Sequence, residues 1–105
     1  MIQLPIFVIV NSERRVYILE PEVVTMWTTR ALVDSFRLPL PEGWSVESIS
    51  GLRQLEVVLA KLLADGCLRV VMDVSHTNQD GLERFQIEDL LAELAMQSTV
   101  FDVFA

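Results

Sequence analysis

The chain has 105 residues, of which 51% are hydrophobic and 22% charged, with a formal net charge of −7. This composition excludes a disordered polypeptide and is ample for one domain over residues 1–105. Fifteen acidic residues oppose eight basic ones, so the surface should repel phosphate backbones, and we expect no nucleic-acid partner. The apolar runs are much shorter than the roughly 20 residues of a membrane span, so we expect no membrane partner.

The beginning of the chain, MIQLPIFVIV, has neither a basic segment nor a small-residue cleavage site. We therefore expect a strand there and not a signal peptide. Cys67 is the only cysteine, so it has no partner for an internal disulfide, and nothing argues for an oxidising compartment. The sequence thus predicts a cytoplasmic protein.

Two apolar runs, residues 4–10 and 15–20, are predicted to be strands that pair as an antiparallel hairpin across the turn NSER. Residues 23–27 are ambiguous and can extend the sheet. A short helix, RALVDSF, should follow, with Thr28 or Thr29 as its N-cap. Its core-facing residues would be Leu32, Val33 and Phe36. The next segment, RLPLPEG, holds two prolines and a glycine and is predicted to be a loop.

Residues 44–74 are typical of a strand, a helix and a second strand. Ser50 can cap the helix, Gly51 begins it, and leucines recur at helical spacing through GLRQLEVVLAKLLAD. Gly66 follows, where a left-handed residue closes a helix at least cost. The run CLRVVMDV is apolar almost throughout, as in a strand covered on both faces. We expect the two strands to be parallel neighbours joined by a right-handed crossover around Gly51–Asp65.

The segment SHTNQDGLE is polar and predicted to be a loop or hairpin turn before a short strand over residues 84–87. The last helix, EDLLAELAMQ, begins with two acidic residues suited to its positive N-terminal end. The tail STVFDVFA is apolar for a chain terminus. Either it adds an edge strand to its own sheet, or it docks on another molecule.

These elements predict an α+β domain with a single mixed β-sheet of four to five strands, in the order β-β-α-β-α-β-α, and helices mainly on one face. The central helix has a wide apolar arc because it also carries Val57, Val58 and Ala60. One sheet covers only one side of a helix. We therefore expect the last helix, the tail or a second subunit to cover its flank.

A search for chemistry yields few candidates. His76 lies in the polar loop near Ser75 and Asp80, but the chain has no G-x-S-x-G nucleophile motif. A solvated loop histidine is the simpler interpretation, and a hydrolase is the least favoured hypothesis. One cysteine and one histidine do not make a zinc site, and the single, separated glycines exclude a phosphate-binding loop. We expect no catalytic residues, no metal site and no cofactor.

Aromatic residues are the best candidates for binding. Trp27 and Trp44 are placed where both can line one end of the sheet, although core or rim packing is the favoured explanation of both. Phe101 and Phe104 belong to the apolar tail. Together with His76 and Asp80, these residues form the predicted contact set.

Most of the chain resembles the N-terminal domain of SseB-like proteins (enhanced serine sensitivity protein B). The resemblance rests on the LPIFVIV…RVYILE hairpin, on WTTRALVDSF, on SISGLRQLEVVLAKLLADGCLRVVMDV and on FQI with EDLLAEL. This chain has Asp73–Val74 where the family often has Asn-Pro or Asp-Pro. The resemblance implies a non-enzymatic domain with a role in interaction or regulation, and it transfers no catalytic residue.

A shorter segment, RVVMDVSHTNQDGLERF, is similar to the strand and phosphoacceptor turn of STAS domains, the anti-sigma factor antagonist type. That resemblance would put Asp80, Gly81 and Leu82 near the phosphoacceptor, although no serine directly follows Asp80. The sequence thus predicts a small non-catalytic protein-interaction or regulatory domain that binds a protein partner or itself as a homodimer. The alternative is a small-ligand-binding sensor or STAS-like regulatory domain that uses the loop from Ser75 to Gly81.

Overall fold

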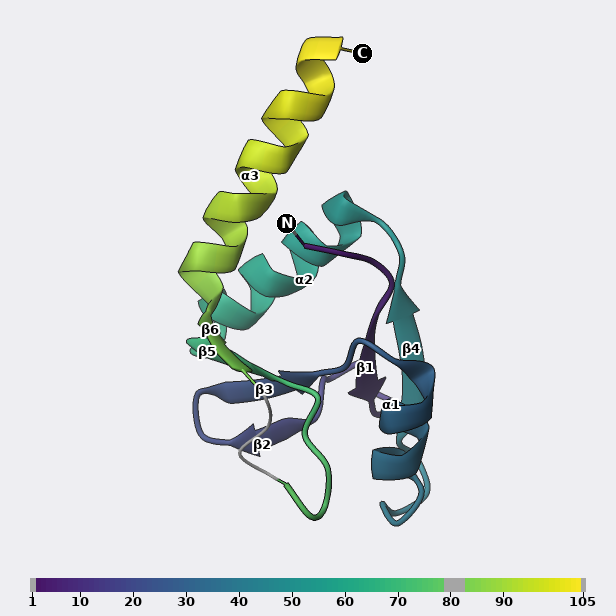
Figure 1. The fold of residues 1–105 in the computed structure, drawn as a ribbon. Coiled ribbons are helices and arrows are strands. Elements are labelled where there is room, and N and C mark those ends of the chain that lie inside the picture. The colour runs from purple at the N-terminus through teal and green to yellow at the C-terminus, as the bar shows by residue number, and fades with distance from the viewer. Residues whose placement is uncertain (1, 79–82, 105) are drawn as a thin grey trace.

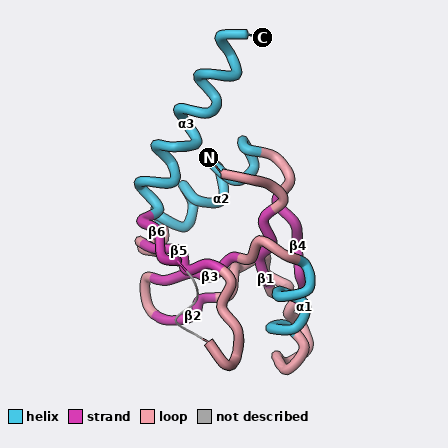
Figure 2. Tube along the Cα trace, viewed as in Figure 1, coloured by secondary structure: helices cyan, strands magenta, loops and turns pink. Residues whose placement is uncertain are grey.

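The computed structural model describes residues 2–78 and 83–104, with side chains up to residue 97 in the last helix. The elements in chain order are β1 (Ile6–Val10), β2 (Ile18–Glu20), β3 (Val23–Met26), α1 (Arg30–Arg37), β4 (Ser45–Ile49), α2 (Leu52–Ala64), β5 (Arg69–Met72), β6 (Glu83–Gln86) and α3 (Ile87–Phe104) (Figure 1). The predicted α+β class is confirmed. In Figure 2, α2 and the first turns of α3 lie next to each other, and α1 lies beside β1 and β4.

The strands divide between two sheets, where a single sheet was predicted. β1 and β4 form an antiparallel pair, and β2, β3, β5 and β6 form a mixed four-stranded sheet in that order. At one end of β1, Phe7 and Trp27 exchange backbone hydrogen bonds of 2.8 and 2.9 Å in an antiparallel bridge, and Trp27 lies just beyond β3. At the other end, Val10 bridges Val16, just before β2. β1 thus contacts the larger sheet at these two bridges and pairs along its length with β4.

The prediction that β4 and β5 are parallel neighbours is wrong. β4 pairs antiparallel with β1, from Ile6 opposite Ile49 to Val10 opposite Ser45. β5 pairs in parallel with β3 and antiparallel with β6. The parallel connection therefore runs from β3 to β5 and includes α1, β4 and α2. Burial explains the choice, because β5 is covered on both sides whereas in β4 only Ile49 is fully buried.

The predicted hairpin of the first two strands exists only at its closed end. Val10 bridges Val16, and the Tyr17 N–H donates to the Ile9 carbonyl at 2.8 Å. Beyond this point β2 leaves β1 and pairs with β3. The turn between β2 and β3 contains Glu22, whose φ is 69°. The ambiguous residues 23–27 thus supply the strand that pairs with β2, and β1 is left for β4.

Side chains of β1 alternate between two cores, as the period of a strand requires. Ile6, Val8 and Val10 pack in a cluster with residues of α2 and α3, including Leu55, Leu59 and Leu94. Phe7 and Ile9 pack in a second cluster, with α1 and the far side of β3 and β5, including Trp27, Val33, Phe36 and Val71. α3 packs beside α2, but it covers only part of the apolar arc that the sequence predicted: Val58 is partly buried, whereas Val57 and Ala60 are exposed.

The helix ends confirm some sequence signals and correct others. Thr29 caps α1, because its hydroxyl accepts from the Leu32 N–H at 3.4 Å. Leu32 itself is 37% exposed and does not join the core, unlike Val33 and Phe36. The N-cap of α2 is Gly51 and not Ser50. The Ser50 N–H instead donates to the Gln54 side chain, so the first turn is closed from inside the helix.

The C-terminus of α2 depends on Gly66. Its φ is +98°, the Gly66 N–H donates to the Leu63 carbonyl, and the Cys67 N–H donates to the Leu62 carbonyl at 2.9 Å. This pair of bonds is the Schellman motif, in which a residue of positive φ reverses the chain. The reversal leads directly into β5.

Substitution of Gly66 by alanine is expected to lower the free energy of unfolding by about 1–2 kcal/mol, because a side chain disfavours positive φ. The added methyl group would meet no atom within 4 Å, so the penalty comes from the backbone alone. Chemical denaturation should measure it. Gly51→Ser is the control: this position is extended at φ −117°, and a serine N-cap should leave stability unchanged or raised. Equal losses in both variants would contradict the role given to Gly66.

The last helix is longer than predicted. α3 continues from Ile87 through the tail to Phe104, so the tail does not add an edge strand. Its first half packs in the core through Ile87 and Leu94, whereas Met96 is 70% exposed. In Figure 1 its final turns extend away from the strands and from α2. No helix within the described residues combines the length and the apolar character needed to cross a membrane.

Candidate functional site

The carboxyl ends of the parallel strands β3 and β5 lie side by side and carry a pair of polar residues. Asp73 follows β5 and accepts from the Thr28 N–H at 2.8 Å and from the Thr28 hydroxyl at 2.9 Å. The Asp73 N–H donates in turn to the Met26 carbonyl. Asp73 has a φ of 56°, a conformation that aspartate tolerates better than most residues. Thr28 thus holds this carboxylate at the carboxyl ends of the parallel strands, which is where ligands bind in α/β proteins.

His76 is held against α1. Its ring stacks on Phe36 with centroids 4.2 Å apart and planes 6° from parallel. Its Nε2 lies 2.8 Å from the Phe36 carbonyl oxygen, which can only accept, so Nε2 carries the proton of this bond. The ring therefore serves to attach the loop to the end of α1. A small hollow of about 180 Å³ lies beside it, lined by Leu32, Ser35, Phe36, Ser75, His76 and Thr77.

In the loop that follows β5, Ser75 and His76 make hydrogen bonds to different partners. Ser75 Oγ lies 3.1 Å from Thr77 Oγ1 and accepts from the Asn78 N–H at 2.9 Å, while His76 is engaged by Phe36. Asp80 lies outside the described residues. Each of these bonds is a contact that stabilises the loop, and none of the three joins Ser75 to His76.

The two tryptophans have different environments. Trp27 is 0% exposed, and its indole Nε1 donates to the Val74 carbonyl at 3.0 Å. Its ring packs on Phe36, with centroids 5.1 Å apart. Trp44 is half-buried and packs edge-on against Tyr17. The structure thus places Trp27 in the core, while Trp44 keeps an accessible edge.

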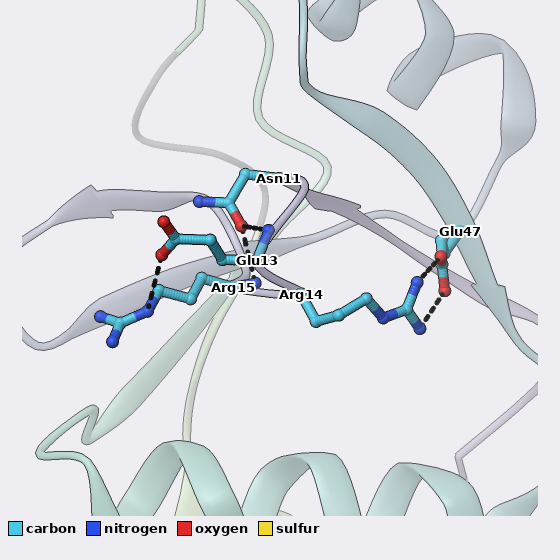
Figure 3. Close-up of polar contacts among 5 residues, drawn as sticks. All are labelled: Asn11, Glu13, Arg14, Arg15 and Glu47. Atoms are coloured by element: carbon cyan, nitrogen blue, oxygen red, sulfur yellow. Dashed lines mark hydrogen bonds and ion pairs between the residues drawn. The ribbon is translucent and has the colours of Figure 1, made fainter.

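The turn between β1 and β2 is organised by one side chain (Figure 3). Asn11 Oδ1 accepts from the Glu13 and Arg15 N–H groups at 3.0 and 2.9 Å. Arg14, at φ 66°, points its guanidinium at Glu47 of β4 and binds it through both terminal nitrogens. The hydrogen bonding and charge of Glu47 raise the pKa of Arg14 above its usual value. This exposed pair links the turn to β4 and is a structural contact.

Cys67 lies between α2 and β5 and is 5% exposed. Burial raises the pKa of its thiol, and the nearby charge of Asp65 adds to the effect. A thiol that stays protonated is a poor nucleophile and a poor metal ligand. Its position in the core indicates a structural role for this cysteine.

Sequence reasoning did not indicate a second, larger cavity than the one beside His76. It has a volume of about 450 Å³ and lies between the four-stranded sheet, α2, α3 and the N-terminal segment. Its walls come from residues spread from Ile2 to Glu93, most of them ordinary apolar residues of amphipathic elements. No spacing along the chain marks them as a group. Within the described part of the chain, no cluster of His, Cys, Asp and Glu could hold a metal ion.

Phe101 and Phe104 lie on the final turns of α3, and their side chains are beyond those described. The backbone nevertheless puts both residues on the part of α3 that extends away from the strands (Figure 1).

No family model matches the sequence, and a search of curated proteins finds no match either. The SseB-like and STAS-like resemblances therefore remain predictions.

Proposed function

We propose that this domain is a non-catalytic protein-interaction module of the regulatory kind, and that it associates with a second copy of itself through the C-terminal half of α3. The observation that carries the proposal is the course of this helix. α3 has 18 residues, and its last turns extend past the rest of the domain. A helix end without tertiary neighbours is marginal in water, so packing against another molecule would stabilise it.

The residue types on these turns support the choice of partner. Residues 96–104 read MQSTVFDVF, with five apolar residues and a single charged one. Met96, the last of the apolar residues with a described side chain on this helix, is 70% exposed. Helical pairs commonly bury such apolar stripes against each other, and self-association of one patch about a two-fold axis is the commonest oligomer.

Sedimentation equilibrium of the full chain should show a concentration-dependent dimer, and deletion of residues 98–105 should raise the monomer fraction. Met96→Glu should do the same without lowering the melting temperature, since this exposed side chain contributes little to the monomer. Thr99→Glu is a control that adds the same charge at a polar position. A full chain that stays monomeric at high concentration contradicts the proposal. So does a deletion that leaves the monomer fraction unchanged and lowers the melting temperature, because it shows that the tail packs internally.

A further inference from the structure

The large cavity has a predominantly apolar lining provided by rigid elements. On the sheet side, Met26, Val70, Met72 and Phe85 share one face, because β3 and β5 pair Met26 with Met72, and β5 and β6 pair Val70 with Phe85. The opposite wall consists of Leu55 and Leu59 of α2 and Leu90 of α3. Ligand sites in proteins typically have such walls and volumes of roughly 300–1,000 Å³.

The N-terminal segment closes one side of the cavity. Ile2 and Gln3 belong to its lining, and the Ile2 N–H donates to Gln97 Oε1 of α3 at 3.0 Å. This bond attaches the N-terminal segment to α3. The space is therefore bounded on several sides and is not a shallow groove on one sheet.

The polar part of the lining is acidic. Asp73, Glu83 and Glu93 all contribute to it. None of the described residues that line the cavity is Lys, Arg or His. Glu83 pairs with Met72 across β5 and β6, and Asp73 follows Met72, so two of these carboxylates come from the same end of the sheet. Thr28 holds the Asp73 carboxylate in one orientation, and its two donors leave the carboxylate with further acceptor capacity.

From this combination we infer that the cavity binds a small amphiphilic cation, an organic amine with a hydrocarbon or aromatic body. The body would lie against Met72, Phe85 and Leu90, the apolar residues of the lining that are only partly buried, and the ammonium group would lie at Asp73 and Glu83. An ammonium group offers donors to carboxylates in charge-assisted bonds, and the apolar walls strengthen them by excluding water. Anionic ligands would meet like charges. The site is separate from the end of α3 and does not depend on self-association.

Three probes of matched shape test the inference: 2-phenylethylamine, 2-phenylethanol and 3-phenylpropionate. Isothermal titration calorimetry of the full chain should show the amine binding about tenfold or more tightly than the carboxylate, with the alcohol between them. Chemical shift changes should be concentrated on the methyl groups of Ile2, Met72 and Leu90, which line the cavity and are only partly buried. Equal binding of all three probes, preference for the carboxylate, or no binding of the amine would overturn the inference.

Two substitutions assign the charge. Asp73→Asn keeps the shape of the side chain and an oxygen that can accept from Thr28, and Glu83→Gln changes an exposed residue at the rim. Each should weaken amine binding by about tenfold and leave binding of the alcohol unchanged. Asp89→Asn is the matched control, because it removes the same charge from an exposed α3 residue outside the lining. If both rim variants melt as the parent does and bind the amine with unchanged affinity, or if Asp89→Asn weakens it equally, the assignment fails.

Discussion

Replacement of Trp27 by alanine is expected to lower the free energy of unfolding by about 3–5 kcal/mol, a large part of the roughly 5–15 kcal/mol that a domain of this size has. Trp27 is fully buried, so alanine leaves a void in the cluster with Phe7, Val33 and Phe36. It also removes the indole donor from the Val74 carbonyl. Urea denaturation followed by circular dichroism measures the loss.

Trp27→Phe separates the two contributions, because it keeps an aromatic ring and removes only the indole N–H and part of the volume. We expect it to cost about 1–3 kcal/mol. Trp44→Ala is the matched control, because Trp44 is only half-buried. The substitution also keeps the hydrogen bond that Arg37 Nε donates to the backbone carbonyl of residue 44. Its expected cost is about 1–2 kcal/mol. A Trp27→Ala variant no less stable than Trp44→Ala would mean that Trp27 is not the core residue described here.

Thr25→Val is expected to stabilise the domain by about 1–2 kcal/mol. Thr25 is 0% exposed, and among the described atoms its hydroxyl oxygen has no hydrogen-bond partner. It lies opposite Val71 in the parallel pair of β3 and β5, on the face shared with Val23 and Trp27. Valine has almost the same shape, so it removes the cost of burying the hydroxyl without leaving a void. Differential scanning calorimetry should show a higher melting temperature.

The same substitution at Thr29 should have the opposite sign. The Thr29 hydroxyl caps α1 by accepting from the Leu32 N–H, and loss of such a cap costs about 0.5–2 kcal/mol. The hydroxyl of Thr25 is buried without a described partner, whereas that of Thr29 is exposed and bonded at a helix N-cap. A lower melting temperature for Thr25→Val would show that the Thr25 hydroxyl is bonded in solution.

The local elements of this fold could be predicted because their signals are local. Gly66, the capping threonine, the leucine stripe of α2 and the acidic start of α3 each act within a few residues. The partners of the strands could not be predicted in the same way. Both β4 and β5 flank one helix, and only burial on both sides of β5 decides that it lies between β3 and β6, while β4 pairs with β1.

The candidate sites show the same limit. Trp27 was a candidate for binding because tryptophan is common at interfaces. Its side chain is instead fully buried in the core, and its indole N–H donates to the Val74 carbonyl. His76 was singled out as the only histidine, and it holds a loop to α1. The cavity depends on where α2 and α3 lie over the sheet, a property that no single segment encodes. Asp73, which lies at the edge of the cavity, belongs to the run CLRVVMDV that was predicted to be a strand.

The pairing of β3 with β5 has a consequence for how the chain reaches its native state. Val23 pairs with Arg69, and Met26 pairs with Met72, although α1, β4 and α2 lie between these partners along the chain. Closing so long a loop costs entropy before the contacts repay it. We therefore expect this distant pairing, and not the fast formation of the individual helices, to limit the rate of folding. Until the two strands pair, the edge that each offers the other is open to other chains.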